Sequence, residues 1–256
     1  MAGEEGRRVA FIGAAQTFGR FAQAPYPTLV GERLARPILN LGYAGAGPVF
    51  FTTKPGVLAL AEESAAVVVQ VLSGRSVSNS LFEAMGGRNL YRRTEDLSRL
   101  GEGEMFAELQ ALPEARRRAL IEETQRNWVE QMLALLEAIK APKLLLWFAS
   151  RSPTDSGRNM DGISLGFPHL VTAPMMQEVR RGADAYLECV TDRGLPQTLR
   201  HPTTGEPVPI RFAPNRVSTV NSYYPSPEMH ADVATALAAP LAALLGDAVE
   251  DAVGLH

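Results

Sequence analysis

Apolar residues gather in five short runs along the chain, and the stretches between them carry mixed polar and apolar positions. The run at 65–72, Ala-Ala-Val-Val-Val-Gln-Val-Leu, is rich in β-branched residues, which indicates a strand buried on both faces. We expect strands at 8–13, 37–42, 65–72, 143–149 and 185–191. The last of these runs also fits the end of a helix.

Three segments carry helical patterns. The first covers 26–35, the longest covers 112–141 with Pro113 in a first-turn position, and the last covers about 228–245 and ends at Gly246. Apolar side chains at helical spacing within 112–141 indicate a helix packed against a core. Strands that alternate with helices predict a three-layer α/β domain of flavodoxin-like type, whose helices cover both faces of a mainly parallel sheet.

Two segments interrupt this alternation. Residues from about 73 to 111 are rich in Gly, Ser and Arg, and we expect them to form an insertion after the third strand. Residues from about 194 to 224 contain Thr203-Thr204-Gly205, a turn sequence that predicts a hairpin followed by a loop. The whole chain, 1–256, is therefore predicted to form a single domain that carries both segments.

Composition and charge limit the partners that we expect. The net charge of −3 does not resemble the strongly basic balance of nucleic-acid-binding proteins. No apolar run reaches the roughly 18 residues of a membrane span, and the charged amino-terminal segment lacks the apolar core of a secretion signal. We therefore expect a cytoplasmic protein that binds a small molecule or a carbohydrate, without a nucleic-acid partner or a membrane span. Whether it forms a homo-oligomer stays open.

Four short motifs occur in an order that resembles the SGNH (GDSL-type) hydrolase superfamily. The chain has Gly-Ala-Ala-Gln-Thr-Phe-Gly at 13–19, Asn-Leu-Gly-Tyr-Ala-Gly at 40–45, Ser-Gly-Arg-Ser-Val-Ser-Asn at 73–79, and Pro-Ser-Pro-Glu-Met-His at 225–230. The first two match the superfamily pattern closely and the other two loosely. The chain also resembles a group of proteobacterial proteins that share Thr-Phe-Gly-Arg-Phe and Asn-Leu-Gly. The resemblance implies that these motifs meet around one cleft of an SGNH-like fold.

The resemblance also identifies what the chain lacks. The Asp-Ser pair of the superfamily, whose serine is the nucleophile, falls on Ala14 and Ala15, and its final Asp falls on Pro227. Ser76 stands near the position of the superfamily's asparagine, and Asn79 follows three residues later. Because alanine has no nucleophilic atom, we do not expect ordinary serine ester hydrolysis.

The remaining motif residues indicate a different chemistry. His230 stands where the resemblance places a catalytic histidine, and a histidine near a helix amino terminus is expected to stay neutral and to be able to act as a general base. An exposed or capping histidine without chemistry is the alternative. The resemblance makes the Gly42 amide an oxyanion donor and implies that the same site contains Gly13, Ala15, Gln16, Thr17, Ser76 and Asn79. The spacing of the four histidines predicts no metal site.

Two arginines follow predicted strands at the same edge of the sheet. Arg75 follows the third strand and Arg151 follows the fourth. The carboxyl ends of parallel strands face one crevice, and guanidinium groups bind carboxylate, phosphate or sulfate, so we expect an anion site there. Solvated loop arginines are the alternative. A coenzyme A thioester is one candidate for an anionic donor, and no other cofactor is indicated.

Three functional hypotheses follow. The first is a non-hydrolytic enzyme that transfers an acyl or sulfuryl group to a hydroxyl acceptor such as a carbohydrate, with His230 as general base. The second is a non-catalytic module that binds an anion or a sugar. The third is a hydrolase with a relocated nucleophile, for which Thr17, Ser73, Ser76 and Ser78 lie near predicted strand ends.

Overall fold

The predicted strands form the centre of the computed structural model, which describes residues 8–155, 166–213 and 216–246. Five strands lie in the order β2-β1-β3-β7-β8, and every neighbouring pair is parallel. Their bounds are β1 Val9–Ile12, β2 Ile38–Asn40, β3 Ala66–Gln70, β7 Lys143–Ala149 and β8 Ala185–Val190. The predicted α/β class with a mainly parallel sheet is confirmed, and the run at 185–191 is a strand. The predicted domain also includes 1–7 and 247–256, which lie outside the described residues.

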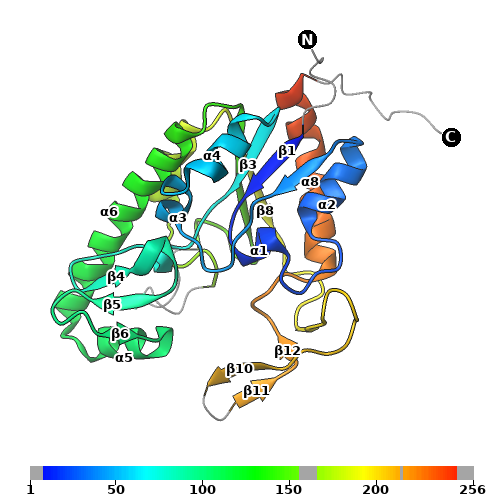
Figure 1. The fold of residues 1–256 in the computed structure, drawn as a ribbon. Coiled ribbons are helices and arrows are strands. Elements are labelled where there is room, and N and C mark those ends of the chain that lie inside the picture. Colours follow the sequence, from blue (N-terminus) through cyan, green and yellow to red (C-terminus); the bar gives the residue numbers. More distant parts are fainter. Residues whose placement is uncertain (1–7, 156–165, 214–215, 247–256) are drawn as a thin grey trace.

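Helices cover both faces of this sheet (Figure 1). One face packs on α2 (Tyr26–Leu34) and α8 (Pro227–Leu245), and the other on α3 (Pro48–Thr52), α4 (Pro55–Glu62), α6 (Glu114–Ala138) and α7 (Ala173–Val179). Every residue of β3 is buried, as its β-branched sequence predicts. No helix within the described ranges is both long and apolar enough to span a lipid bilayer.

The segment at 73–111 is folded rather than irregular. It begins with a short 3-10 turn, Gly74–Ser76, and contains an antiparallel sheet of β4 (Phe82–Ala84), β5 (Tyr91–Arg93) and β6 (Arg99–Leu100), with a second 3-10 turn, Met85–Gly87, and the helix α5 (Glu102–Ala111). Its apolar side chains form a separate cluster that includes Phe82, Met105 and Leu109, together with Leu120 of α6. This inserted unit therefore packs against α6 with a small core of its own.

The segment at 194–224 folds into two short strand pairs. The strands β9 (Gln197–Thr198) and β12 (Val220–Asn221) pair antiparallel, as do β10 (Ile210–Ala213) and β11 (Arg216–Ser218). The chain reverses at the Thr-Thr-Gly sequence, where the His201 amide donates to the Glu206 carbonyl over 2.8 Å and Gly205 has a φ of +73°. Two other short elements, α1 (Ala15–Phe18) and the 3-10 turn Arg180–Gly182, complete the described secondary structure.

The turn after β1 is closely packed, so a substitution at Gly13 tests this packing directly. A methyl group at Gly13 would overlap Thr17 Oγ1 and lie 2.6 Å from Gln70 Oε1. Gly13→Ala should therefore lower the free energy of unfolding by about 1–3 kcal/mol, measured by urea denaturation. Gly56→Ala, in α4 with no atom within 4 Å of the added methyl, is the matched control and should be neutral or stabilising by up to about 1 kcal/mol. Equal losses in both variants would contradict this packing.

Candidate functional site at the carboxyl edge of the sheet

The topology of the sheet locates the place where a ligand is expected. The chain leaves β1 toward β2 on one side and then crosses back to β3 on the other side of β1. In open parallel sheets, ligands bind beyond the carboxyl ends of the strands at such a switch point. The turns that follow β1, β2 and β3 are therefore the elements to examine, and three of the motifs lie in them.

A buried glutamine joins the turn after β1 to the end of β3. Gln70 Oε1 accepts hydrogen bonds from the Ala14 amide over 3.1 Å and from Thr17 Oγ1 over 2.6 Å. The hydroxyl groups of Thr17 and Tyr26 are also hydrogen-bonded, 2.8 Å apart. These contacts hold Ala15 at the first position of α1.

The turn after β2 packs onto the same place. The Tyr43 amide donates to the Gly13 carbonyl over 2.9 Å, and Asn40 Nδ2 donates to the Thr17 carbonyl over 2.8 Å. The Gly42 amide donates to Asn40 Oδ1 over 2.9 Å. The structure therefore brings Gly13 and Gly42 together, but the amide expected to act as an oxyanion donor is bonded to Asn40.

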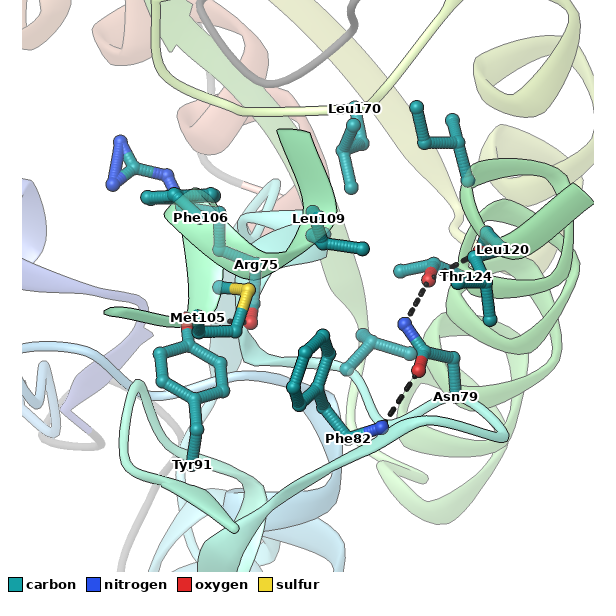
Figure 2. A pocket seen from close by; sticks show the side chains of 13 residues that line it. Arg75, Asn79, Phe82, Tyr91, Met105, Phe106, Leu109, Leu120, Thr124 and Leu170 are labelled. Atoms are coloured by element: carbon teal, nitrogen blue, oxygen red, sulfur yellow. Dashed lines mark hydrogen bonds between the residues drawn. The ribbon is translucent and has the colours of Figure 1, made fainter. Parts of the chain in front are cut away.

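The predicted residues after β3 separate into two environments. Ser76 donates to the Gly45 carbonyl over 3.0 Å, so it lies against the turn after β2. Asn79 lies in the inserted unit, where Nδ2 donates to Thr124 Oγ1 of α6 over 3.0 Å and Oδ1 accepts from the Phe82 amide over 2.9 Å (Figure 2). Asn79 thus ties the inserted unit to α6.

His230 lies in the first turn of α8 and is almost completely buried. Its Nδ1 accepts a hydrogen bond from the Tyr26 amide over 3.2 Å, and its ring stacks on the Tyr26 ring. It therefore caps the amino terminus of α2, where the first backbone amides have no helical partner. Burial lowers the pKa of His230 to about 4, so the ring is neutral at pH 7. Because Nδ1 accepts, the neutral ring has its proton on Nε2.

A second buried histidine makes a cluster that the sequence did not predict. His169 Nδ1 lies 3.1 Å from Ser73 Oγ, and Arg75, which also pairs with Glu102, contacts His169 Nε2. The ring of Tyr223 stacks on His169 with centroids 5.9 Å apart. Ser73 and His169 are 96 residues apart, and neither the apolar periodicity nor the superfamily motifs mark His169.

The contact with Arg75 determines which ring nitrogen of His169 carries the proton. A guanidinium can only donate, so His169 Nε2 is an acceptor and the neutral ring has its proton on Nδ1. His169 therefore donates to Ser73 Oγ and cannot take the proton of that hydroxyl. Burial, followed by the charges of Arg75 and Arg151, lowers the pKa of His169 to about 2, which keeps the ring neutral.

The two arginines expected to bind an anion are engaged with the protein. The guanidinium of Arg75 contacts Glu102 and His169. Arg151 is buried against the ring of Trp147 and donates to the carbonyls of four residues, which are Ser152, Gly166, Pro168 and Val171. Four of the five N–H donors of a guanidinium are thus used at Arg151.

A small cavity adjoins α1. It is lined by Gln16, Phe148, Ala149, Ser150, Gly166, Phe167, Leu195, Ser222, Tyr223, Pro225 and Met229. Gln16 is 3% exposed, and its Oε1 has no hydrogen-bond partner among the residues that the structure describes. Gln70 Nε2 is likewise buried and unpaired within those residues. Two unpaired amide atoms therefore lie beside the turn that contains Ala15.

The parallel sheet and the helices on both of its faces form an SGNH-like α/β fold. The chain belongs to the family described as Domain of unknown function (DUF6473), whose model matches residues 3–245. No curated protein matches the sequence.

Solved structures agree with this fold at low sequence identity. The acetyl xylan esterase Est2A from Butyrivibrio proteoclasticus matches with a TM-score of 0.51 and 11% identity over 94% of this chain. This chain spans 64% of the length of Est2A. A catalytic mutant of Axe2, an acetylxylan esterase from Geobacillus stearothermophilus, matches with a TM-score of 0.46 and 10% identity over 94% of both chains. The similarity to Est2A concerns the fold alone.

The two buried histidines make stability depend on pH in a defined direction. Both have folded-state pKa values below the ordinary value of 6.5, so between pH 6.5 and about 4 the unfolded chain binds protons that the folded protein does not. Stability is therefore lost as the pH falls below 6.5, by up to about 1.4 kcal/mol per pH unit for each histidine. His169→Gln should have a shallower slope between pH 6.5 and 5 in urea denaturation.

His201→Gln is the matched control, because His201 is exposed in the hairpin loop. It should leave the pH slope unchanged. If the free energy of unfolding falls with pH equally in the wild type and in His169→Gln, then His169 takes up its proton equally in the folded and unfolded states.

Proposed function

We propose that the protein binds a neutral, hydroxyl-rich ligand of carbohydrate type at the opening of the small cavity beside Ala15, and that it does not cleave an ester there. The observation that carries this proposal is the unpaired Oε1 of Gln16. A buried amide atom without a partner costs about 1–3 kcal/mol, and such atoms are uncommon in native proteins unless they meet water or a ligand. A ligand hydroxyl that donates to Gln16 would remove this cost.

The lining of the cavity supports a neutral ligand. Its polar side chains are the amide of Gln16 and the hydroxyls of Ser150, Ser222 and Tyr223, and its aromatic rings are Phe148, Phe167 and Tyr223. None of these side chains carries a formal charge at pH 7. Hydroxyl and amide groups hydrogen-bond to sugar hydroxyls, and aromatic faces pack on the apolar face of a sugar ring.

Exposed aromatic residues near α1 extend this surface. Phe18 is 54% exposed, Tyr43 is 44% exposed and Tyr223 is 40% exposed. Phe18 lies in α1 beside Gly42, the residue that precedes Tyr43, and Tyr223 lines the cavity together with Gln16. Large exposed rings that gather near a polar cavity suit a ligand longer than one sugar unit. Est2A, whose fold is similar, is named an acetyl xylan esterase, but the proposal depends on the lining of this cavity.

The state of the two buried histidines supports binding without hydrolysis. A serine nucleophile needs a base with a free lone pair within hydrogen-bond reach. In His230 the lone pair on Nδ1 is bonded to the Tyr26 amide. In His169 the lone pair on Nε2 faces Arg75.

A second candidate is transfer of an acyl or sulfuryl group to a carbohydrate hydroxyl, with His230 as general base. It is favoured by the lowered pKa of His230, because the ring stays unprotonated at neutral pH. It requires His230 to release the Tyr26 amide. His230→Gln would then keep ligand binding and lose turnover, whereas in a binding module it would change only stability.

Binding is tested with neutral oligosaccharides. Isothermal titration calorimetry with xylohexaose and cellohexaose should detect binding to the wild type by at least one of them. Gln16→Ala should weaken that binding by about 10-fold, equivalent to one lost hydrogen bond of about 1.4 kcal/mol. Gln23→Ala, at an exposed position outside the cavity lining, should bind like the wild type. Equal binding by both variants would exclude Gln16 as a ligand contact.

Restoring a serine at position 15 tests the absence of catalysis. Ala15→Ser should not hydrolyse 4-nitrophenyl acetate above the wild-type level, since no free ring nitrogen is available to take the serine proton. Neither protein should be labelled by a fluorophosphonate probe. Labelling of the wild type would support a relocated nucleophile, and labelling of Ala15→Ser alone would show that a working base is present.

A further inference from the structure

We infer that the outer edge of β8 is an interface for a second copy of this chain. The two copies pair antiparallel along β8, around a two-fold axis at Leu187, so that their sheets join into one continuous sheet. Such an axis uses the same surface of both copies, which is the commonest arrangement among homo-oligomers. No residue of β8 lines the cavity of the proposed ligand, so the two proposals are independent.

The outer edge of β8 has no partner strand within the described ranges. β8 is the last strand of the sheet and pairs with β7 alone, over Ala185–Val190. Among the described residues, no hydrogen bond joins the backbone of this strand to an element other than β7. A row of backbone N–H and C=O groups on such an edge is a template for a further strand.

The sequence of β8 lacks the features that usually protect an exposed edge. Ala-Tyr-Leu-Glu-Cys-Val contains no lysine, proline or glycine, and its six residues follow β7 without a bulge. Val190 at the end of the strand is 46% exposed. The opposite edge strand, β2, is only three residues long, and short edge strands resist pairing. Of the two edges of the sheet, β8 is therefore the one suited to a partner.

The side chains of β8 alternate between the two faces of the sheet. Ala185 and Leu187 pack against the core cluster of α2 and α8, and Tyr186 packs against the cluster on the other face. Successive strand residues point to opposite faces, so Glu188 and Val190 share the face of Tyr186. On that face Tyr186 Oη donates to Glu188 Oε1 over 2.7 Å. A second copy therefore meets an alternating polar and apolar edge like its own.

The single charged residue of the strand determines the register. Opposed residues of antiparallel strands share a face, so a two-fold axis passes beside one residue, which then faces its own copy. The centre of β8 lies between Leu187 and Glu188, so an axis at either residue gives the fullest overlap. An axis at Glu188 opposes two carboxylates, which is destabilising. An axis at Leu187 instead places Glu188 opposite the partner's Tyr186, a hydrogen-bond donor, and Ala185 opposite the partner's Cys189.

Association is tested by analytical ultracentrifugation of the full chain between about 1 and 300 µM, because an interface of one strand pair lies at the weak end of specific interfaces. The mass should rise with concentration toward that of a dimer. Tyr186→Glu should weaken association by about 10-fold or more, because it opposes carboxylates at two positions, whereas Tyr186→Lys should keep or strengthen it through the partner's Glu188.

Val217→Glu is the matched control, since Val217 lies in β11 and is 55% exposed. It should associate like the wild type. A monomer at every concentration, or equal association of the wild type and a Tyr186→Glu variant that folds by circular dichroism, would overturn the proposal.

A disulfide between copies tests the register without any change at Tyr186. Cys189 is the single cysteine of the chain, and Ala185→Cys places a second thiol opposite the partner's Cys189. Within one chain these two positions are about 13 Å apart along the strand, too far to be bridged. Mild oxidation should therefore link Ala185→Cys into a dimer that a reducing agent separates.

Val190→Cys is the control for this experiment, because position 190 lies opposite the partner's Asp184 in the proposed register. Although it is the more exposed position, it should not link the copies. Absence of the link in Ala185→Cys, or equal linking of both variants, would overturn the register and with it the interface.

Discussion

The site depends on one buried oxygen atom, Gln70 Oε1. It accepts from the Ala14 amide and from Thr17 Oγ1, so a single side chain of the central strand fixes the turn after β1. Thr17 then pairs with the Tyr26 hydroxyl, and the Tyr26 amide donates to His230. The turn after β1 and the α2–α8 face are thus connected through buried hydrogen bonds. Breaking the Gln70 contact would leave buried donors unpaired, each at a cost of about 1–3 kcal/mol.

This network explains how the turn after β1 keeps its shape with alanines at positions 14 and 15. Ala14 and Ala15 contribute their backbone to the turn, and the backbone geometry is maintained by Gln70 and Asn40. The imidazole of His230 is used to cap α2, which is a structural task. The space beside α1 remains, and it is lined by amide, hydroxyl and aromatic groups. These observations agree better with recognition of a ligand than with proton transfer.

The fold was predictable from the sequence because its strands are dense in β-branched and apolar residues and its glycine turns have recognisable spacing. The convergence of Gly13 and Gly42 was predictable for the same reason. The strands of the inserted unit are two or three residues long, which is too short to show a period of two. The pairing of His169 with Ser73 joins segments 96 residues apart, and no local pattern encodes such a contact. Arg75 and Arg151 do follow strands of the sheet, at its carboxyl edge. The salt bridge of Arg75 and the carbonyl partners of Arg151 depend on tertiary packing.

Arg75 joins the buried His169 to the inserted unit. Its charge is balanced by Glu102 at the start of α5, and its contact with His169 fixes the tautomer of that histidine. The Tyr91 hydroxyl also donates to the Arg75 carbonyl over 3.0 Å, so the inserted sheet is tied to the same residue. The guanidinium contacts Glu102 and His169, so it cannot swing away without releasing α5 and His169 together. Arg75 therefore joins α5, the inserted sheet and His169 through contacts of one residue.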